Sequence, residues 1–86
     1  MICRYKEEAF YVIGGTFAGP FINVPRKDVH RFDLRNDQFV DAPCLNEGRY
    51  GGSACELDGF IYAFWGKSGN FKTNYLNTIE KLDVAS

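Results

Sequence analysis

An 86-residue chain that is 45% hydrophobic and 16% aromatic has the size and composition of one small globular unit, which buries roughly 60% of its unfolded surface. Its 10 basic and 11 acidic residues are scattered and give a net charge of −1, so we expect neither nucleic acid nor an anionic membrane as a partner. The chain has no apolar run of about 18 residues and begins without the apolar core of a signal peptide, so we expect a soluble, cytoplasmic protein.

The first half of the chain predicts four β-strands. Residues 1–6 and 9–15 predict a hairpin, because the second of these runs is rich in aromatic and β-branched residues and ends at two glycines. The stretch 16–28 holds prolines, glycines and large apolar side chains, and it predicts a long loop that interrupts any regular element. Residues 29–34 and 38–41 then predict a second hairpin.

The second half predicts three strands in the same order. After an irregular segment at 44–50, residues 51–57 and 60–66 predict a hairpin around an Asp-Gly turn. A polar loop over 67–77 leads to a last strand at 78–84. No stretch shows a sustained 3.6-residue apolar period, so we expect essentially no helix.

The two halves are a sequence repeat. Tyr62 stands 62 − 11 = 51 positions after Tyr11, and the apolar strand around each tyrosine ends at a glycine. We therefore divide the chain into a complete four-stranded unit at 1–43 and a second unit at 44–86 that lacks its last strand.

These features resemble kelch repeats, the units of roughly 50 residues that form the blades of a β-propeller. The residues that carry the resemblance are Gly14-Gly15 after an apolar strand, the strand 29–33 with aromatic Phe39 beyond it, Arg49-Tyr50-Gly51, and Asp58-Gly59. The sequence departs from the family at Phe39, which replaces a tryptophan, and at Trp65-Gly66, which replaces a second glycine pair.

The resemblance implies an all-β fold of kelch-type β-propeller blades, each a four-stranded antiparallel sheet. Propellers have about 4 to 8 blades, so further blades or additional copies of the chain are needed to close a ring. Because the last blade ends one strand short, we expect the chain to be a fragment of a longer propeller.

No catalytic, metal or cofactor site is expected from the residues. Ser53 lies outside a G-x-S-x-G motif, and His30 has no second ligand at metal-binding spacing. Asp33 and Asp83 stand at equivalent strand ends, where turn formation is the expected role. The three cysteines lack C-x-x-C spacing and are expected to be reduced and packed.

The expected function is therefore a non-catalytic protein–protein interaction module, an adaptor or scaffold that binds a protein partner through its loops. The candidate contact residues are Phe17, Phe21, Arg26, Arg49, Phe71 and Tyr75.

Three alternatives stay open. The apolar loop side chains could instead pack over their own blade. Arg49, which matches an arginine that opens a blade in the family, either faces a central channel and meets an acidic peptide or braces the next loop. Kelch-like propellers also include oxidases and sugar isomerases, and the active site of such an enzyme would lie outside this chain.

Overall fold

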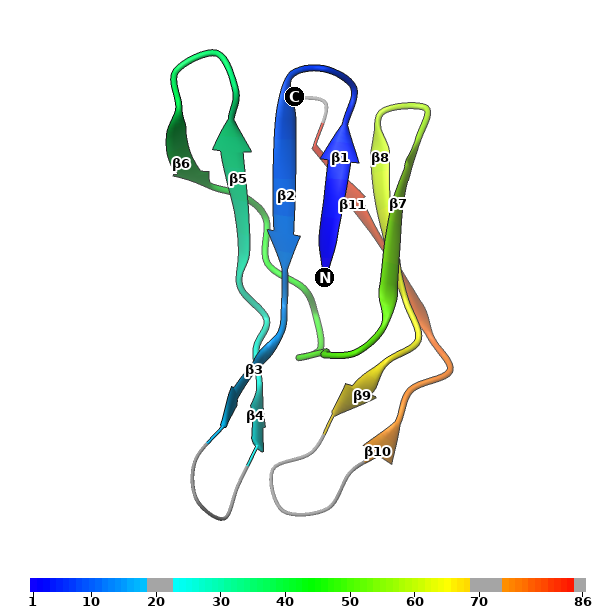
Figure 1. Cartoon of the computed structure of the whole chain (residues 1–86). Coiled ribbons are helices and arrows are strands. Elements are labelled where there is room, and N and C mark those ends of the chain that lie inside the picture. The colour runs from blue at the N-terminus through cyan, green and yellow to red at the C-terminus, as the bar shows by residue number, and fades with distance from the viewer. Residues whose placement is uncertain (19–22, 69–73, 85–86) are drawn as a thin grey trace.

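The computed structural model describes residues 1–18, 23–68 and 74–84 (Figure 1). Within these ranges the chain forms β-strands and no helix, and every strand pair is antiparallel. The prediction of an all-β fold without helix is therefore confirmed for this part of the chain.

The first sheet has four strands in the order β1-β2-β5-β6. Their bounds are β1 (Ile2–Tyr5), β2 (Ala9–Ile13), β5 (Val29–Asp33) and β6 (Gln38–Asp41). Asp33 shapes the turn between β5 and β6, because its carboxylate accepts a hydrogen bond from the backbone N–H of Arg35 at 2.8 Å.

The second sheet has three strands in the order β11-β8-β7. Their bounds are β7 (Ser53–Leu57), β8 (Phe60–Phe64) and β11 (Ile79–Asp83). The Asp58-Gly59 turn joins β7 to β8, and the Glu56 carboxylate fixes it by accepting the Gly59 N–H at 2.9 Å.

Two short ribbons project from the same end of the sheets (Figure 1). One pairs β3 (Thr16–Ala18) with β4 (Asn23–Pro25), and the other pairs β9 (Lys67–Ser68) with β10 (Asn74–Tyr75). The prediction that 16–28 interrupts any regular element is wrong for β3 and β4. Pro25 fits there because it ends an edge strand, where a missing N–H breaks no central ladder.

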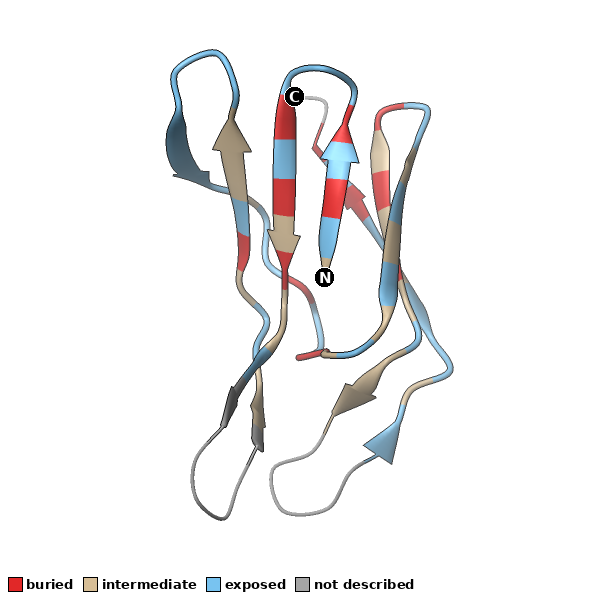
Figure 2. Cartoon of the chain, viewed as in Figure 1, coloured by how far each residue is buried: buried red, intermediate tan, exposed pale blue. Residues whose placement is uncertain are grey.

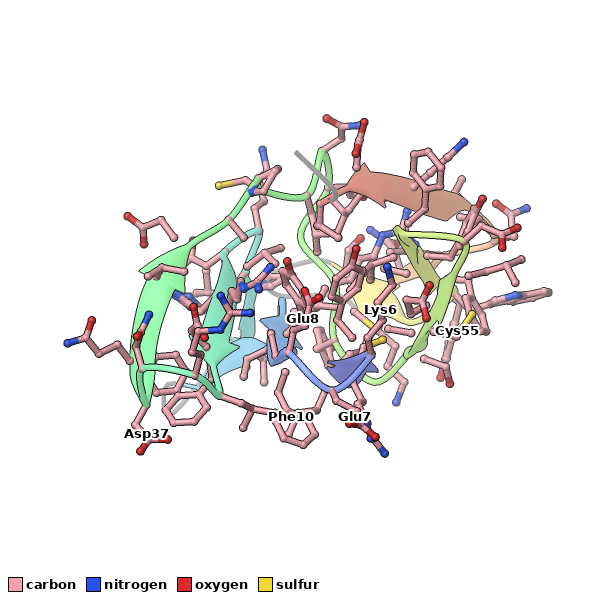
Figure 3. The ribbon with its side chains drawn as sticks, turned by 90° about the horizontal axis from the view of Figure 1, so that it is seen from above. Lys6, Glu7, Glu8, Phe10, Asp37 and Cys55 are labelled. Carbon is pink, nitrogen blue, oxygen red and sulfur yellow. The ribbon has the colours of Figure 1, made fainter. Side chains whose placement is uncertain are left out.

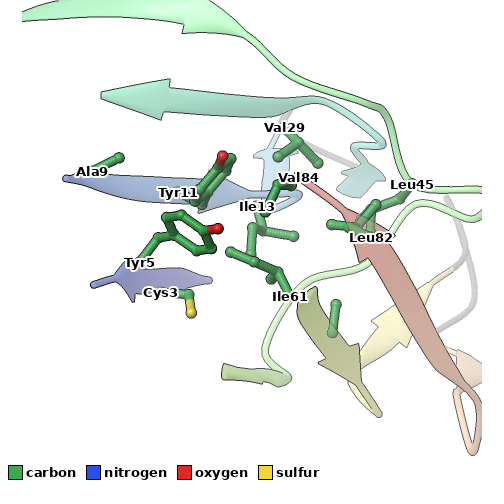
Figure 4. Close-up of a cluster of buried hydrophobic side chains, with 11 residues drawn as sticks. Cys3, Tyr5, Ala9, Tyr11, Ile13, Val29, Leu45, Ile61, Leu82 and Val84 are labelled. Carbon is green, nitrogen blue, oxygen red and sulfur yellow. The ribbon is translucent and has the colours of Figure 1, made fainter. Parts of the chain in front are cut away.

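The hydrophobic core lies between the two sheets (Figure 4). Its residues are Cys3, Tyr5, Ala9, Tyr11, Ile13, Val29, Leu45, Ile61, Ala63, Leu82 and Val84. Burial alternates along β2 and β8, so each sheet is covered on one face only (Figure 2).

The core also contains one polar contact from the first sheet. Tyr5 and Tyr11 meet edge to face with 5.9 Å between ring centroids, and Arg31 Nη1 donates a hydrogen bond to the Tyr11 hydroxyl at 3.0 Å. This hydrogen bond raises the pKa of Arg31 above its ordinary value, although burial acts in the opposite direction. The hydroxyl of Tyr11 is thus satisfied inside the packed face.

Candidate functional site

The segment 44–50 joins the two sheets and ties the bases of both ribbons together. Leu45 N–H donates to the Lys27 carbonyl at 2.8 Å, and Gly15 N–H donates to the Arg49 carbonyl at 2.7 Å. On the other side, Tyr50 and Lys67 exchange backbone hydrogen bonds at 3.1 and 2.8 Å. The ribbons are therefore anchored to one shared segment.

Arg49 is the centre of this anchor, with only 1% of the residue exposed. Its Nη1 donates to the carbonyls of Trp65 at 3.1 Å and Thr78 at 2.9 Å, and its Nη2 donates to the Thr78 hydroxyl at 2.6 Å. Its Nε donates to Glu80 at 3.0 Å. Arg49 thus braces the neighbouring loop, which is one of the two alternatives that the sequence left open, and it presents no exposed group to a partner.

Glu80 completes the anchor from β11. Its carboxylate accepts the backbone N–H groups of Asn46 at 2.6 Å and Glu47 at 3.1 Å, besides the Arg49 Nε. A carboxylate that accepts three N–H groups satisfies the lone pairs that burial would otherwise leave unpaired. The pair therefore fixes segment 44–50 against the second sheet.

Glycines allow the strands to leave the sheets close to this segment. Gly14 has φ +60°, and a Cβ built on it would lie 2.5 Å from the Arg49 carbonyl oxygen. Trp65 and Gly66 repeat the backbone of Gly14 and Gly15, with φ values of 63° and 99° against 60° and 104°. The same backbone turn therefore opens both ribbons.

A hollow of about 480 Å³ lies at the base of the second ribbon. It is lined by Gly51, Trp65, Gly66, Lys67, Tyr75, Leu76 and Asn77. Tyr75 is 78% exposed and Trp65 is 59% exposed, and the Lys67 ammonium lies 5.7 Å from the centre of the Tyr75 ring. Two exposed aromatic side chains and a cation here surround a concave surface.

The structure places the predicted contact residues in different surroundings. Tyr75 lines the hollow, whereas Arg49 is buried and donates a hydrogen bond to the Trp65 carbonyl. Phe17 belongs to β3, but its side chain, like residues Phe21 and Phe71, lies outside what the structure describes.

Arg26 is exposed and its guanidinium pairs with the Asp28 carboxylate, with the Nε hydrogen bond at 3.1 Å. This hydrogen bond lowers the pKa of Asp28 below its ordinary value. The pair leaves the Arg26 charge already balanced at the base of the first ribbon.

Trp65 and Lys67 were not among the residues predicted to contact a partner. The signal for Trp65 was present in the sequence, because a tryptophan stands where the repeat has a glycine. Lys67 carries no such signal, since its position over the Tyr75 ring depends on the pairing of β9 with β10.

The described residues contain no group of three or more His, Cys, Asp and Glu side chains that could hold a metal ion. All three cysteines are free. Cys3 is buried, whereas Cys44 and Cys55 are exposed, so the expectation of packed cysteines is wrong for Cys44 and Cys55. Burial raises the pKa of the Cys3 thiol, and the nearby Cys55 and Glu56 add to the rise.

Two comparisons of this sequence with known proteins were made. A scan against protein-family models matches no family, and a search of the curated proteins finds no match. The kelch resemblance therefore stays a prediction from the sequence. No helix in the described part of the chain is long and apolar enough to cross a membrane.

Proposed function

We propose that this chain is a non-catalytic, cytoplasmic protein-binding module built from kelch-type repeats, and that its partner binds at the ribbon end. The observation that carries the proposal is the hollow between exposed Trp65 and Tyr75 at the base of the second ribbon. A few residues carry most of the binding energy in protein interfaces, and tryptophan and tyrosine are enriched among them. The buried contact of Arg49 with Glu80 supports it by holding that surface in one shape.

The kelch assignment is supported by the shared arrangement of the two sheets. In each, the two hairpin strands pair with each other, β1 with β2 and β7 with β8. The second hairpin strand also pairs with the strand that returns from the ribbon, β2 with β5 and β8 with β11. Propeller blades have this order of antiparallel strands. In a kelch-type propeller the two ribbons would lie on the same face, and the family commonly binds partner proteins on that face.

The lining of the hollow favours a particular kind of partner segment. Lys67 is the charged residue among the side chains that line it, and the rest of the lining is aromatic, aliphatic, amide or glycine. An apolar or aromatic side chain followed by a carboxylate would bury its apolar part between Trp65 and Tyr75 and pair with Lys67. We propose a peptide segment of that composition as the partner's contact.

The test compares variants at the ribbon end with a variant in the turn between β1 and β2. Partners are isolated with the wild-type chain, and the affinity of each purified partner is measured for wild type, Tyr75→Ser, Lys67→Glu and Glu7→Ser. Tyr75→Ser and Lys67→Glu should each weaken binding roughly tenfold or more, since interface anchors contribute at least about 1 to 2 kcal/mol. Glu7→Ser, in the exposed turn between β1 and β2, should leave the affinity unchanged.

Equal affinities for wild type and Tyr75→Ser, or failure to isolate any partner that binds the purified chain directly, would reject the proposal. Circular dichroism of each variant checks that the sheets remain folded.

A further inference from the structure

The two sheets repeat each other residue by residue, as their pairing registers show. In the first sheet Tyr11 of β2 lies opposite Cys3 of β1 and Arg31 of β5. In the second sheet Tyr62 of β8 lies opposite Cys55 of β7 and Lys81 of β11. Tyr62 is thus the structural counterpart of Tyr11, and each neighbouring strand has its own counterpart on the same side.

The core is formed by one face of the repeated unit in the first sheet and by the opposite face of that unit in the second sheet. The first sheet contributes the face that carries Tyr11 and Ile13. The second contributes the face that carries Ile61 and Ala63. Because neighbouring residues of a strand point to opposite faces, the counterpart of the Tyr11 face is the Tyr62 face, which points away from the core.

The outer face of the second sheet is therefore a second copy of a face that the core buries. It carries Cys55, Leu57, Phe60, Tyr62, Phe64 and Ile79. Leu57 is 58% exposed although its counterpart Tyr5 is 4% exposed, and Ile79 is 62% exposed although its counterpart Val29 is 2% exposed.

Two details extend the likeness of these faces. The Lys81 ammonium lies 3.9 Å from the centre of the Phe60 ring, as Arg31 lies over the rings of Tyr5 and Tyr11 in the first sheet. A shallow, mostly apolar hollow of about 390 Å³ is lined by residues of this outer face. The face thus has the composition of one half of the core without the other half.

The outer face of the first sheet is the matching half. Its residues Phe10 and Val12 are the counterparts of the buried Ile61 and Ala63. Viewed from above, Phe10 points away from the second sheet (Figure 3). Phe32 and Phe39 pack edge to face on the same outer face at 4.9 Å, and Phe39 is 64% exposed.

We propose that these two outer faces bind each other between two copies of this chain, head to tail. The β7-β8-β11 face of one copy would cover the β1-β2-β5-β6 face of the next, and the contact would repeat the one between the two sheets inside each chain. Because such a contact joins two different faces, the assembly grows by adding copies in one direction. It becomes a closed ring when the rotations between successive copies add up to a full turn. The size of the ring rests on the proposed kelch-type architecture: with two sheets per chain, a propeller of about 4 to 8 sheets needs roughly two to four copies.

The proposal concerns the sheet faces and is independent of the ribbon-end site. Its occupant is a second copy because the chain itself shows how the two faces fit. An isologous contact, in which a face meets its own copy, has no such template in the structure.

The test uses two double variants at exposed positions. Ile2→Glu with Phe39→Glu places charge on the outer face of the first sheet, and Leu57→Glu with Ile79→Glu does so on the second. The wild-type chain should show a mass that rises with concentration above the 9.8 kDa of one chain in sedimentation equilibrium. Each double variant alone should remain at the mass of one chain.

An equimolar mixture of the two double variants should form a complex of two chains, because it restores one intact contact. This restoration also shows that both variants are folded. Glu7→Ser, in the exposed turn between β1 and β2, should associate as the wild type does.

Three results would overturn the proposal. The first is a wild-type chain that stays a monomer over the whole concentration series. The second is a mixture that stays monomeric. The third is a double variant that still dimerises alone, which would show a contact between identical faces.

Discussion

Trp65 holds a backbone conformation that a side chain normally disfavours. Its φ of 63° matches the 60° of Gly14, its counterpart in the first sheet, and both lie in the left-handed region. A residue with a Cβ loses roughly 1 to 2 kcal/mol there. The second ribbon thus has the same turn as the first, with local strain at Trp65. The indole of Trp65 lies beside the hollow.

Replacing Trp65 with glycine and with alanine separates the strain from the ring. Both substitutions remove the indole, but only glycine removes the Cβ, so Trp65→Gly should be more stable than Trp65→Ala by about 1 kcal/mol. Urea denaturation of the two variants measures the difference. Alanine as stable as glycine would show that the turn relaxes without strain.

At the scale of residues, only part of the site could be predicted from the sequence. Tyr75 could be proposed from its place in an aromatic loop, and Arg49 from its family position. The burial of Arg49 could not be foreseen, because its acceptors come from residues 16 and 31 positions away, at Trp65 and Glu80. Contacts over such distances depend on how the sheets pack.

At the scale of elements, segment 44–50 connects the two sheets and the two ribbons to one another. Arg49 meets β11 through Glu80 and the first ribbon through its own backbone, whose N–H donates to the Arg26 carbonyl at 3.2 Å. An irregular segment therefore fixes two sheets and two ribbons relative to one another.

Arg49→Ala should destabilise the fold by roughly 3 to 5 kcal/mol, because it leaves the Glu80 side chain, which is only 9% exposed, without its cation. Arg26→Ala is the matched control, since it removes an exposed arginine from an exposed pair and should change stability little. Thermal unfolding followed by circular dichroism compares the two. Similar melting temperatures for both variants would show that the buried pair contributes no more than the exposed one.

The strands themselves were largely predictable, since aromatic and β-branched runs bounded by glycine turns mark β2 and β8. The ribbons were not, because β4 contains Pro25 and β3 and β4 have only three residues each. Such short strands are stabilised by pairing across a long connection, and no local sequence pattern predicts that pairing.

At the scale of the whole molecule, one core supports two sheets that are each covered on a single face. The repeat could be read from the sequence, whereas the choice of faces could not. An apolar strand such as β8 reads as buried on both sides, because residues on its two faces are equally apolar. Only the packing shows that Ile61 is enclosed and that its neighbours on the opposite face are half-buried.

A shared core predicts that the two sheets unfold together. Ile61 is fully buried in the core, and Ile61→Ala should cost about 2 to 5 kcal/mol through lost burial and the cavity left behind. A domain of this size has a stability of roughly 5 to 10 kcal/mol, so the loss should appear in every slowly exchanging amide. Ile79→Ala, on the outer face of the same sheet, is the control and should have a small effect in dilute solution. Hydrogen exchange should accelerate by the same factor in β2 and β8 of Ile61→Ala. Acceleration confined to β7, β8 and β11 would instead show that the first sheet keeps its structure when the second opens.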